Sequence, residues 1–597
     1  MNDDLWGLHL LENGHGKARI WAPAAEHMSL EIGDRTIPMD RDETGWFEAH
    51  LDQPVAGEAY RFVTQDGRKV ADPASRWQAG TVDGPSLVTD PKAYSWIHRD
   101  WLGRPWHEAV TYELHVGTFT AEGTFLAAAR KLKELAELGF TAIELMPVAA
   151  FHGERGWGYD GVLAYAPHPA YGKPDDLKHL VDCAHGAGMM VILDVVYNHF
   201  GIYGNMLEQY APQFFLKDST PWGPAPDFSR KETRSYFIEN ALYWLSDFRL
   251  DGLRFDAADR LVAQNQPWLV DEIADRAKNL LPDRTLHLVA EDARNITSPL
   301  EWKDGRAPSC RAVWNDDFHH AVHVLATGET VGHYADFAAE PSVGVRTALA
   351  EGFIYQGQAR PSKEGKRHGE PSGHLPPTCF VNFLQNHDQI GNRLKGDRLS
   401  ALVEEDILKA LTAMLYLSPQ IPLAFMGDEF GTRQSFYFFS DYPSEVHEAA
   451  LKARMEEARN FGGSLYEKDF RAPDPNKRTT FLASKLQRPL AEDARSTSWR
   501  EFVRELLAKR RSWIWPMLER LPSTEALVLP APDKVIAVDW RLGNHKLELR
   551  CNLGREVATS PTTSGEVFYS LSAEPGTKTL PPGGAIFASS GQADFQE

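Results

Sequence analysis

The chain has 597 residues, which exceeds one ordinary domain and indicates about three or four. Lys and Arg number 63 and Asp and Glu number 83, so the formal net charge is −20. An acidic surface of this kind disfavours non-specific binding to nucleic acid or to an anionic membrane, and it is compatible with a neutral substrate.

The first residues, Met1–Trp6, show neither the basic nor the apolar region of a secretory signal. No apolar run approaches the ~20 residues of a membrane helix. Cys183, Cys310, Cys379 and Cys551 lie far apart without CxxC spacing. This spacing predicts buried thiols, with neither a zinc site nor a disulfide framework. We therefore expect a cytoplasmic protein.

Residues 1–95 are rich in short strands separated by Gly, Asp and Pro. Strands are expected at 17–22, 28–32, 46–51 and 59–63. Met28–Ile32 alternates with period two and is followed by Gly33-Asp34, which is typical of a strand that ends in a turn. Several such strands predict an N-terminal β-sandwich.

From residue 106 onward, apolar strands alternate with helical segments. Eight strands are expected at 110–116, 141–146, 189–195, 253–255, 286–290, 312–314, 380–384 and 421–425. Helices are expected at 125–138, 175–185, 234–248 and 268–281. The fold class is therefore α/β, and the alternation predicts a catalytic (β/α)8 TIM barrel over 106–520. A doubly wound open sheet is the alternative.

Two long insertions interrupt this alternation. Residues 200–231 follow the third strand and are rich in Pro, Gly and aromatic residues, and residues 356–377 precede the seventh strand. Long loops in a compact domain are commonly functional. After residue 525 short apolar runs return, which predicts a small C-terminal β-domain over 521–597.

Acidic segments follow four of the predicted barrel strands, in chain order: Asp194–His199, Gly252–Asp256, Ala290–Asp292 and Gln385–Asp388. The C-terminal ends of barrel strands surround one active site. We therefore expect these distant segments to meet.

Arg254 and Asp256 flank one residue, so their side chains share a face of the fourth strand. A neighbouring guanidinium lowers the pKa of a carboxylate, so Asp256 is expected to be ionised, as a nucleophile requires. Glu291 beside apolar walls can hold a proton and act as general acid. Together with a third acid that holds sugar hydroxyls, they predict a retaining glycosidase whose two carboxyl groups lie roughly 5–5.5 Å apart.

Each segment alone has an ordinary structural explanation. An Arg-x-Asp on a strand is usually an ion pair, and Asn-His-Asp is commonly a turn or a helix cap. The same acids and histidines are also compatible with a divalent metal. Metal barrels usually carry close His pairs, however, and the nearest candidates, His319, His320 and His323, fall in a helical pattern. The four segments in order favour the glycosidase.

These segments resemble the conserved regions of the α-amylase family of glycoside hydrolases (family 13). The resemblance covers nearly the whole chain, including an N-terminal sandwich like a carbohydrate-binding module, as in isoamylases and branching enzymes. It implies that Asp256 is the nucleophile, Glu291 the general acid/base and Asp388 the carboxylate that stabilises the transition state. It implies no cofactor and no metal.

The resemblance also implies a set of residues that surround the substrate. Tyr159 stacks on the sugar ring with Asp160 beside it. Asp194 holds Arg254 in place, and that arginine, His199 and His387 surround the same ring.

Some segments of the sequence resemble one branch of this family and other segments resemble another. The segments 144–148 and 157–161 are similar to branching enzymes. Residues 383–393 and 352–357 resemble the members that act on maltooligosyltrehalose, which implies hydrolysis of the α-1,4 bond next to its terminal trehalose and release of trehalose. A glycogen branching enzyme and an isoamylase-type debranching enzyme are alternatives, as is a non-enzymatic starch-binding protein with an inactive barrel.

Several positions bear on the leaving-group side. Asp259 and Arg260 stand where amylases often have Lys-His, which implies a changed site that seats trehalose. Phe353 and Tyr355 are candidates for an aromatic wall on this side, with core packing as the alternative. Asn198 matches a calcium-ligand position of amylases, but no full oxygen cage surrounds it in the sequence, so we predict no structural calcium.

Overall fold

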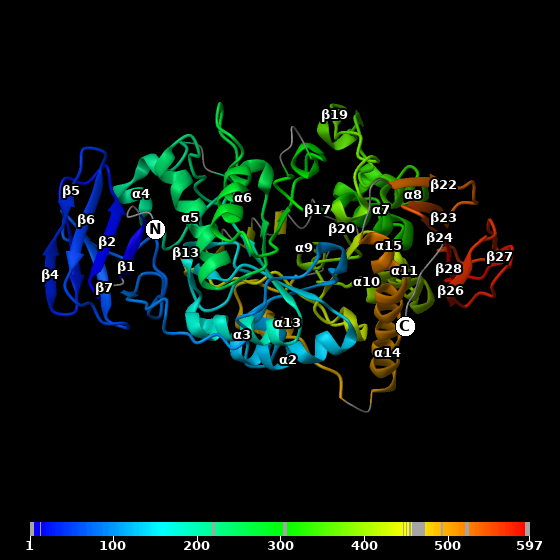
Figure 1. Ribbon diagram of the computed structural model, residues 1–597, viewed down its shortest axis with the longest axis horizontal. Helices are drawn as coiled ribbons and strands as arrows, with labels where there is room; N and C mark the ends of the chain where they lie inside the picture. Colours follow the sequence, from blue (N-terminus) through cyan, green and yellow to red (C-terminus); the bar gives the residue numbers. More distant parts are fainter. Residues whose placement is uncertain are drawn as a thin grey trace.

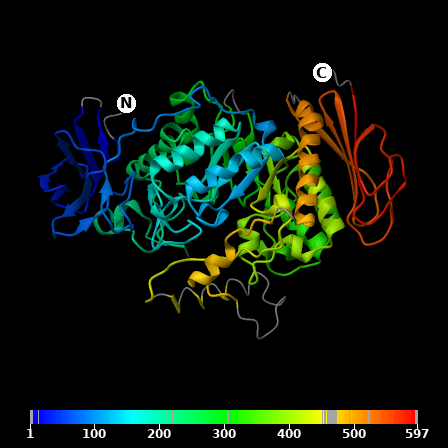
Figure 2. The same ribbon diagram turned by 90° about the horizontal axis from the view of Figure 1, so that it is seen from below.

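The computed structural model describes residues 5–11, 14–217, 220, 222–302, 307–445, 447–448, 451–452, 455–456, 472–490, 493–519 and 524–591. Figure 1 shows three parts in a row, with antiparallel sheets from the two ends of the chain on opposite sides of a central barrel. The view from below (Figure 2) gives the same order. The predicted fold class is confirmed.

Two antiparallel sheets form the N-terminal part. One has the order β1 (Gly7–Leu10), β2 (Gly16–Trp21), β6 (Trp46–Leu51) and β5 (Asp40–Arg41). The other has the order β4 (Arg35–Pro38), β3 (Met28–Ile32), β7 (Ala59–Thr64) and β8 (Lys69–Val70), with β9 (Ser86–Leu87) beside β7. Trp6 joins the first sheet to the barrel, because its backbone N–H donates to Glu239 at 3.0 Å and its indole N–H to Ser235 at 3.2 Å.

All eight predicted barrel strands are present, and they pair in chain order into a closed parallel barrel. They are β10 (Thr111–Leu114), β11 (Ala142–Leu145), β14 (Met190–Val195), β15 (Gly252–Phe255), β16 (His287–Ala290), β17 (Ala312–Trp314), β20 (Phe380–Phe383) and β21 (Ile421–Phe425). The main helices between them are α2 (Phe125–Leu138), α3 (Pro174–Gly186), α5 (Lys231–Asp247), α6 (Leu269–Leu280), α7 (Asp316–Thr327) and α11 (Glu405–Leu417). The helix α2 has the predicted bounds, and Gly139 ends it in the left-handed conformation at φ 114°.

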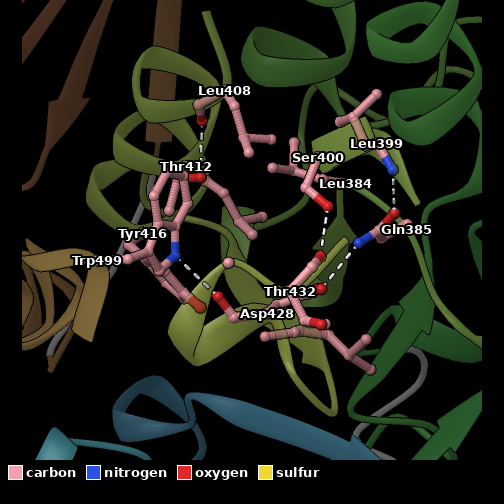
Figure 3. A pocket seen from close by; sticks show the side chains of 14 residues that line it. Leu384, Gln385, Leu399, Ser400, Leu408, Thr412, Tyr416, Asp428, Thr432 and Trp499 are labelled. Carbon is pink, nitrogen blue, oxygen red and sulfur yellow. Dashed lines mark hydrogen bonds between the residues drawn. The ribbon is translucent and has the colours of Figure 1, made fainter. Parts of the chain in front are cut away.

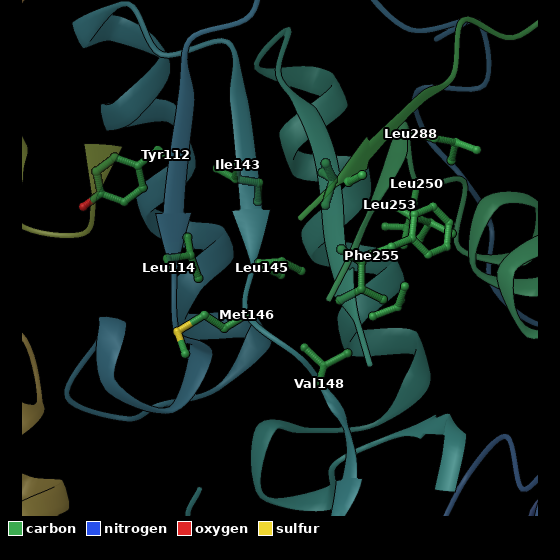
Figure 4. Close-up of a cluster of buried hydrophobic side chains, with 14 of the residues drawn as sticks. Tyr112, Leu114, Ile143, Leu145, Met146, Val148, Leu250, Leu253, Phe255 and Leu288 are labelled. Atoms are coloured by element: carbon green, nitrogen blue, oxygen red, sulfur yellow. The ribbon is translucent and has the colours of Figure 1, made fainter. Parts of the chain in front are cut away.

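Successive side chains along each barrel strand point alternately outward and inward, so the barrel has two separate hydrophobic cores. Side chains that point outward pack against the helices, as Figure 4 shows for Ile143, Leu145, Leu253 and Phe255. Residues of the inward face form a separate apolar cluster that includes Met190, Ile192, Val289, Val381 and Leu423. One step further along the same inward faces, near the C-terminal strand ends, the side chains become charged: Glu113, Glu144, Asp194 and Arg254.

The C-terminal sheet has the order β22 (Thr524–Val528), β23 (Val535–Leu542), β24 (His545–Asn552), β28 (Ala585–Ser590) and β26 (Glu566–Leu571). The strand β28, which begins with the apolar run Ala585–Ala588, was not predicted. Trp540 fixes this sheet to α8 (Pro341–Glu351) by donating to the Leu349 carbonyl at 2.9 Å. The domain limits 1–95, 106–520 and 521–597 stay predictions.

The two insertions differ in structure. The described part of residues 200–231 contains α4 (Leu207–Tyr210) and η3 (Pro212–Phe214), and Phe214 packs edge-on against Tyr236 of α5 with ring centroids 5.4 Å apart. Residues 356–377 contain the hairpin of β18 (Gln358–Ala359) and β19 (Arg367–His368). In the described part of the chain, no helix has both the length and the apolar character of a membrane span.

Candidate active site

One buried arginine binds three carboxylates at the C-terminal end of the barrel. Arg254 Nη1 donates to Asp194 Oδ2 at 2.7 Å and to Asp256 Oδ1 at 3.0 Å. Its Nη2 donates to Glu291 Oε2 at 2.8 Å. The Trp314 ring centroid lies 4.0 Å from the guanidinium carbon, a cation–π contact that stabilises the buried charge. Four neighbouring strands, β14 to β17, thus bring three of the acidic segments to one point.

Asp256 follows β15 directly and is held on two sides. Asn198 Nδ2 donates to Asp256 Oδ2 at 2.7 Å and to its carbonyl at 3.0 Å. The next residue, Ala257, has a φ of 41°, a left-handed conformation that is strained for alanine. This turn directs the Ala257 N–H to Glu291 Oε2 at 3.0 Å. The strained turn therefore ties the Asp256 loop to the Glu291 loop.

The two carboxyl groups also interact directly. Burial is the largest influence on the pKa of both Asp256 and Glu291 and raises both, while Arg254 lowers both. The two side chains also act on each other in opposite directions, because Glu291 lowers the pKa of Asp256 and Asp256 raises that of Glu291. This mutual effect favours an ionised Asp256 beside a protonated Glu291.

The predicted effect of the neighbouring guanidinium is confirmed, because Arg254 lowers the pKa of Asp256, but it does not set the direction of the net shift. Burial and the charge of Asp194 together outweigh Arg254, so the pKa of Asp256 is raised. The sequence shows the neighbouring guanidinium but not the loss of hydration around the carboxylate. The hydrogen bond from Asn198 favours the ionised form and replaces part of that hydration.

Tyr159 joins the cluster from the loop between β12 (Ala149–Phe151) and β13 (Gly161–Pro167). Its hydroxyl donates to Asp194 Oδ2 at 2.6 Å. Its ring stacks on His387, with centroids 5.1 Å apart and planes 20° apart. His199 Nε2 donates to the Tyr159 carbonyl at 2.8 Å. The structure therefore places these four residues around one site.

His387 and Asp388 begin the short helix α9 (His387–Gly391) after β20. Glu113 of β10 fixes the histidine, with Nδ1 donating to Oε1 at 2.5 Å and the backbone N–H to Oε2 at 3.1 Å. Burial lowers the pKa of His387, but Glu113 and Asp388 together raise it, so the net shift is upward. Asp388 is exposed, and Asn392 Nδ2 donates to its Oδ1 at 2.8 Å.

A glycine allows α9 to pack this closely. A Cβ atom on Gly391 would lie 2.0 Å from the Trp157 indole. The Trp157 ring in turn lies 5.3 Å from the His387 ring, edge-on. A larger side chain at Gly391 would therefore displace the helix that carries His387 and Asp388.

Asp160 lies next to Tyr159 and is partly buried. Burial raises the pKa of this carboxyl to about 7, and its own backbone N–H lowers it. A carboxyl group with such a pKa can donate or accept a hydrogen bond near neutral pH. Its predicted contact with the substrate stays a prediction.

Asp259 and Arg260 lie on the turn η4 (Ala258–Arg260) just after Asp256. Arg260 Nε lies 3.5 Å from Asp259 Oδ2, and the arginine side chain is 73% exposed. The Ala258 N–H donates to the Glu291 carbonyl at 2.8 Å, which fixes the turn beside the acid/base loop. Their role in seating a leaving group stays a prediction.

Phe353 and Tyr355 do not form an exposed aromatic wall. Phe353 is 1% exposed, and its ring packs edge-on against Phe380 with centroids 5.2 Å apart. Tyr355 is 8% exposed, and its hydroxyl donates to the Asp336 carbonyl at 2.8 Å. Core packing, the alternative explanation, is what the structure shows, because stacking on a sugar requires an exposed ring face.

Three residues that support the site were not assigned to it from the sequence. Glu113 fixes His387, Trp314 covers Arg254, and Asn198 binds Asp256. A lone acid within an apolar strand was a usable signal for Glu113, because a buried charge needs a partner. Nothing in the local sequence distinguished Trp314 from an ordinary core residue.

A small cavity of about 30 Å³ lies behind this site, between α11 and the ends of β20 and β21 (Figure 3). It is large enough for one water molecule. Gln385, just before α9, donates to Asp428 Oδ1 at 2.8 Å in its wall. Burial raises the pKa of Asp428 to about 6, and Arg398 opposes the shift. The residues around the cavity support α9, and the cavity is too small for a sugar.

Within the described residues, no three His, Cys, Asp or Glu side chains are grouped so as to hold a metal ion. His319 and His323 of α7 bind protein atoms instead. His319 Nδ1 donates to the Leu384 carbonyl at 2.7 Å, and His323 Nε2 lies 2.8 Å from Glu329 Oε2. They tie α7 to its surroundings.

Comparison with known proteins identifies the family. Residues 107–209 match the family model described as alpha amylase, catalytic domain, and residues 522–587 match a domain of unknown function, DUF3459. The malto-oligosyltrehalose trehalohydrolase of Saccharolobus solfataricus is 38% identical over 83% of this chain and 85% of that protein. The Arthrobacter ramosus protein of the same name is 39% identical over 82% and 86%. The chain belongs to the malto-oligosyltrehalose trehalohydrolase family.

Solved structures agree with this membership. A crystal structure described as an alpha amylase of Salmonella typhimurium matches this trehalohydrolase-family chain with a TM-score of 0.94 and 44% identity, over 98% of this chain and 99% of that one. A GBS pullulanase in complex with maltotetraose has a TM-score of 0.71 at 18% identity, which shows a shared fold. The Corynebacterium jeikeium 1,4-alpha-glucan branching enzyme is 32% identical over 46% of this chain. The chain is thus a glycoside hydrolase with an α-amylase catalytic barrel.

Proposed function

We propose that this chain hydrolyses the α-1,4-glucosidic bond next to the terminal trehalose of maltooligosyltrehalose and releases trehalose. Asp256 is the nucleophile, Glu291 the general acid/base and Asp388 the third carboxylate. Family membership supports the substrate. The observation that carries the residue assignment is that Arg254 donates hydrogen bonds to Asp256 at 3.0 Å and to Glu291 at 2.8 Å, which places both carboxyl groups at one point.

The first step uses a proton on Glu291, whose pKa is raised by burial and by the charge of Asp256. The Asp256 carboxylate attacks the anomeric carbon while the bond from that carbon to the leaving oxygen breaks. The electrons of the broken bond take up the Glu291 proton, and trehalose leaves. A glycosyl ester on Asp256 and a carboxylate on Glu291 remain.

The second step reverses these roles. The Glu291 carboxylate takes a proton from a water molecule as the water oxygen attacks the anomeric carbon. The ester bond to Asp256 breaks, and the maltooligosaccharide leaves with its anomeric configuration retained. Both carboxyl groups return to their starting protonation.

The surrounding groups suit the positive charge that the anomeric carbon develops in each step. The carboxylates of Asp194, Asp256 and Asp388 stabilise that charge, and Arg254 keeps the first two from repelling each other at rest. The Tyr159 ring, fixed through His387 and Asp194, offers its face to the sugar. The carboxyl separation of roughly 5–5.5 Å stays a prediction of the retaining mechanism.

Product analysis tests the substrate. Incubation of the purified chain with maltooligosyltrehalose, followed by chromatography, is expected to yield trehalose and a maltooligosaccharide. A branching enzyme would instead create α-1,6 branches in amylose, and a debranching enzyme would release reducing ends from amylopectin. Either result without trehalose release would overturn the proposal.

Trapping of the glycosyl ester tests the residue assignment separately. Glu291→Gln treated with α-maltotriosyl fluoride is expected to form the ester, because fluoride leaves without a proton. The ester should persist, because no base activates water. Mass spectrometry of peptides should find the added mass on the segment that contains Asp256. A label on another carboxylate would refute Asp256 as nucleophile.

A further inference from the structure

The two adjacent acids at the start of α7, Asp316 and Asp317, have different surroundings. Asp317 Oδ2 accepts hydrogen bonds from Asn295 Nδ2 at 2.8 Å, from the Ile354 N–H at 2.8 Å and from the Tyr355 N–H at 3.1 Å. Asp317 is 3% exposed, so it serves to join three loops. The Asp316 carboxyl receives no hydrogen bond or ion pair from the residues that the structure describes, and it is only partly buried.

Asp316 has a fixed position at the mouth of the barrel. The preceding residue, Asn315, caps α7 and donates from Nδ2 to Asn382 Oδ1 of β20 at 3.0 Å. Two residues before Asp316, Trp314 covers the guanidinium of Arg254. In the barrel order, β17 lies between β16, which precedes Glu291, and β20, which precedes Asp388. Asp316 therefore lies at the rim between the acid/base and the third carboxylate.

The electrostatics agree with this position. Burial raises the pKa of Asp316 to about 8, and the charges of Glu291, Asp388 and Asp317 add to the shift, while Arg254 opposes it. A neutral carboxyl group both donates and accepts hydrogen bonds. Such a group at the rim, with its hydrogen-bonding capacity unused by the protein, is suited to a sugar hydroxyl.

The order of strands in the barrel also indicates which sugar of the substrate lies next to Asp316. Tyr159, which offers its ring to the glycosyl unit, comes from the loop after β11, and β17 lies four strands further round the eight-stranded barrel. Asp316 is thus on the side opposite to the ring that holds the glycosyl unit. It adjoins Glu291, whose proton goes to the leaving oxygen. The leaving sugar is therefore the part of the substrate nearest to Asp316.

We propose that Asp316 hydrogen-bonds a hydroxyl group of the leaving disaccharide and so contributes to selection of trehalose as the leaving group. This inference rests on the proposed function, because it needs trehalose on that side. Asp317, one residue along the same helix, has a structural role and is the matched control.

The experiment compares Asp316→Ala, Asp316→Asn and Asp317→Asn with the wild type. Each protein is assayed on maltooligosyltrehalose and on 4-nitrophenyl α-maltopentaoside, whose aryl leaving group has no sugar hydroxyl. For Asp316→Ala, the ratio of kcat/KM between the first and second substrate is expected to fall about 10- to 100-fold. Asp316→Asn keeps a donor and an acceptor, so its ratio should stay within about threefold of the wild-type ratio.

Trehalose binding gives a readout that does not need turnover. Calorimetry should show at least about tenfold weaker binding of trehalose to Asp316→Ala than to the wild type, with Asp316→Asn intermediate or unchanged. Asp317→Asn should lower the thermal unfolding midpoint and leave the substrate ratio close to the wild-type value. Circular dichroism checks that each variant is folded.

Several outcomes would overturn the inference. If Asp316→Ala left both the substrate ratio and trehalose binding unchanged, the proposed hydrogen bond between Asp316 and the leaving disaccharide would be refuted. Equal losses on both substrates would show that Asp316 acts through the catalytic acids. Failure of the proposed function would be distinct, because the wild type itself would then release no trehalose from maltooligosyltrehalose.

Discussion

Glu113 of the first barrel strand holds His387 beyond the seventh strand through both of its oxygens, at 2.5 Å from Nδ1 and 3.1 Å from the backbone nitrogen. Both side chains are buried. A carboxylate in this position favours the charged imidazolium, which burial alone would disfavour. The first and seventh strands are thus coupled directly under the site.

Glu113→Gln is expected to destabilise the fold by about 3 kcal/mol, because it removes one partner of a buried pair. The pKa of His387 is raised in the folded chain, so the pair stabilises fully below the unfolded histidine pKa of about 6.5. That stabilisation is lost as the pH rises through the folded pKa. The difference in unfolding free energy between wild type and variant should therefore shrink above neutral pH in urea titrations. If the difference in unfolding free energy instead grew with pH, a stabilising ion pair between Glu113 and His387 would be contradicted.

Asp256→Asn is expected to lower kcat by about 10⁴-fold or more, because an amide is not a nucleophile. The side chain keeps its shape, so the free energy of unfolding should change by no more than about 1–2 kcal/mol. Steady-state kinetics and denaturant titrations on the same preparation measure both. Wild-type turnover in this variant would exclude Asp256 as the nucleophile.

Glu144→Gln is expected to be tolerated. Burial, followed by the charge of Glu113, raises the pKa of Glu144 well above its ordinary value, while Arg254 lowers it. The buried Oε1 atom has no hydrogen-bond partner, so the amide loses no contact there. As the pH rises above about 4.5, the unfolded wild type loses this proton and the folded chain keeps it. The wild type should therefore lose stability relative to the variant by up to about 1.4 kcal/mol per pH unit.

The measurement for Glu144→Gln is a set of urea titrations between pH 4.5 and pH 7. A constant difference in unfolding free energy over this range would show that Glu144 ionises equally in the folded and unfolded chain. A protonated Glu144 in the folded chain would then be ruled out.

Tyr159→Phe and Tyr159→Ala separate the hydroxyl from the ring. The phenylalanine variant loses the hydrogen bond to Asp194, which should lower kcat/KM about 3- to 10-fold. The alanine variant also loses the ring face that stacks on His387 and should lower it about 100-fold or more. Kinetics on maltooligosyltrehalose decide. Equal losses in both variants would show that the ring makes no separate contribution.

The eight strands and the meeting of four segments were predictable because they depend on periodicities that the sequence shows directly. Glu113 and His387 are 274 residues apart, and nothing local in either strand specifies that pair. The net pKa shift of Asp256 was not predictable from its neighbour Arg254, because hydration depends on the whole barrel. Phe353 was ambiguous, because an apolar ring in a loop has the same sequence pattern whether it faces a sugar or the core.

The sharing of Arg254 among Asp194, Asp256 and Glu291 has a consequence for the resting enzyme. One positive charge cannot balance three negative ones, which favours retention of a proton in the cluster, and the pKa of Glu291, the proposed proton donor, is raised. In the proposed mechanism, Glu291 therefore already carries the proton for the leaving group before the glycan binds. Each turnover in the proposed mechanism ends with Glu291 protonated again, by a proton from the water molecule that hydrolyses the ester.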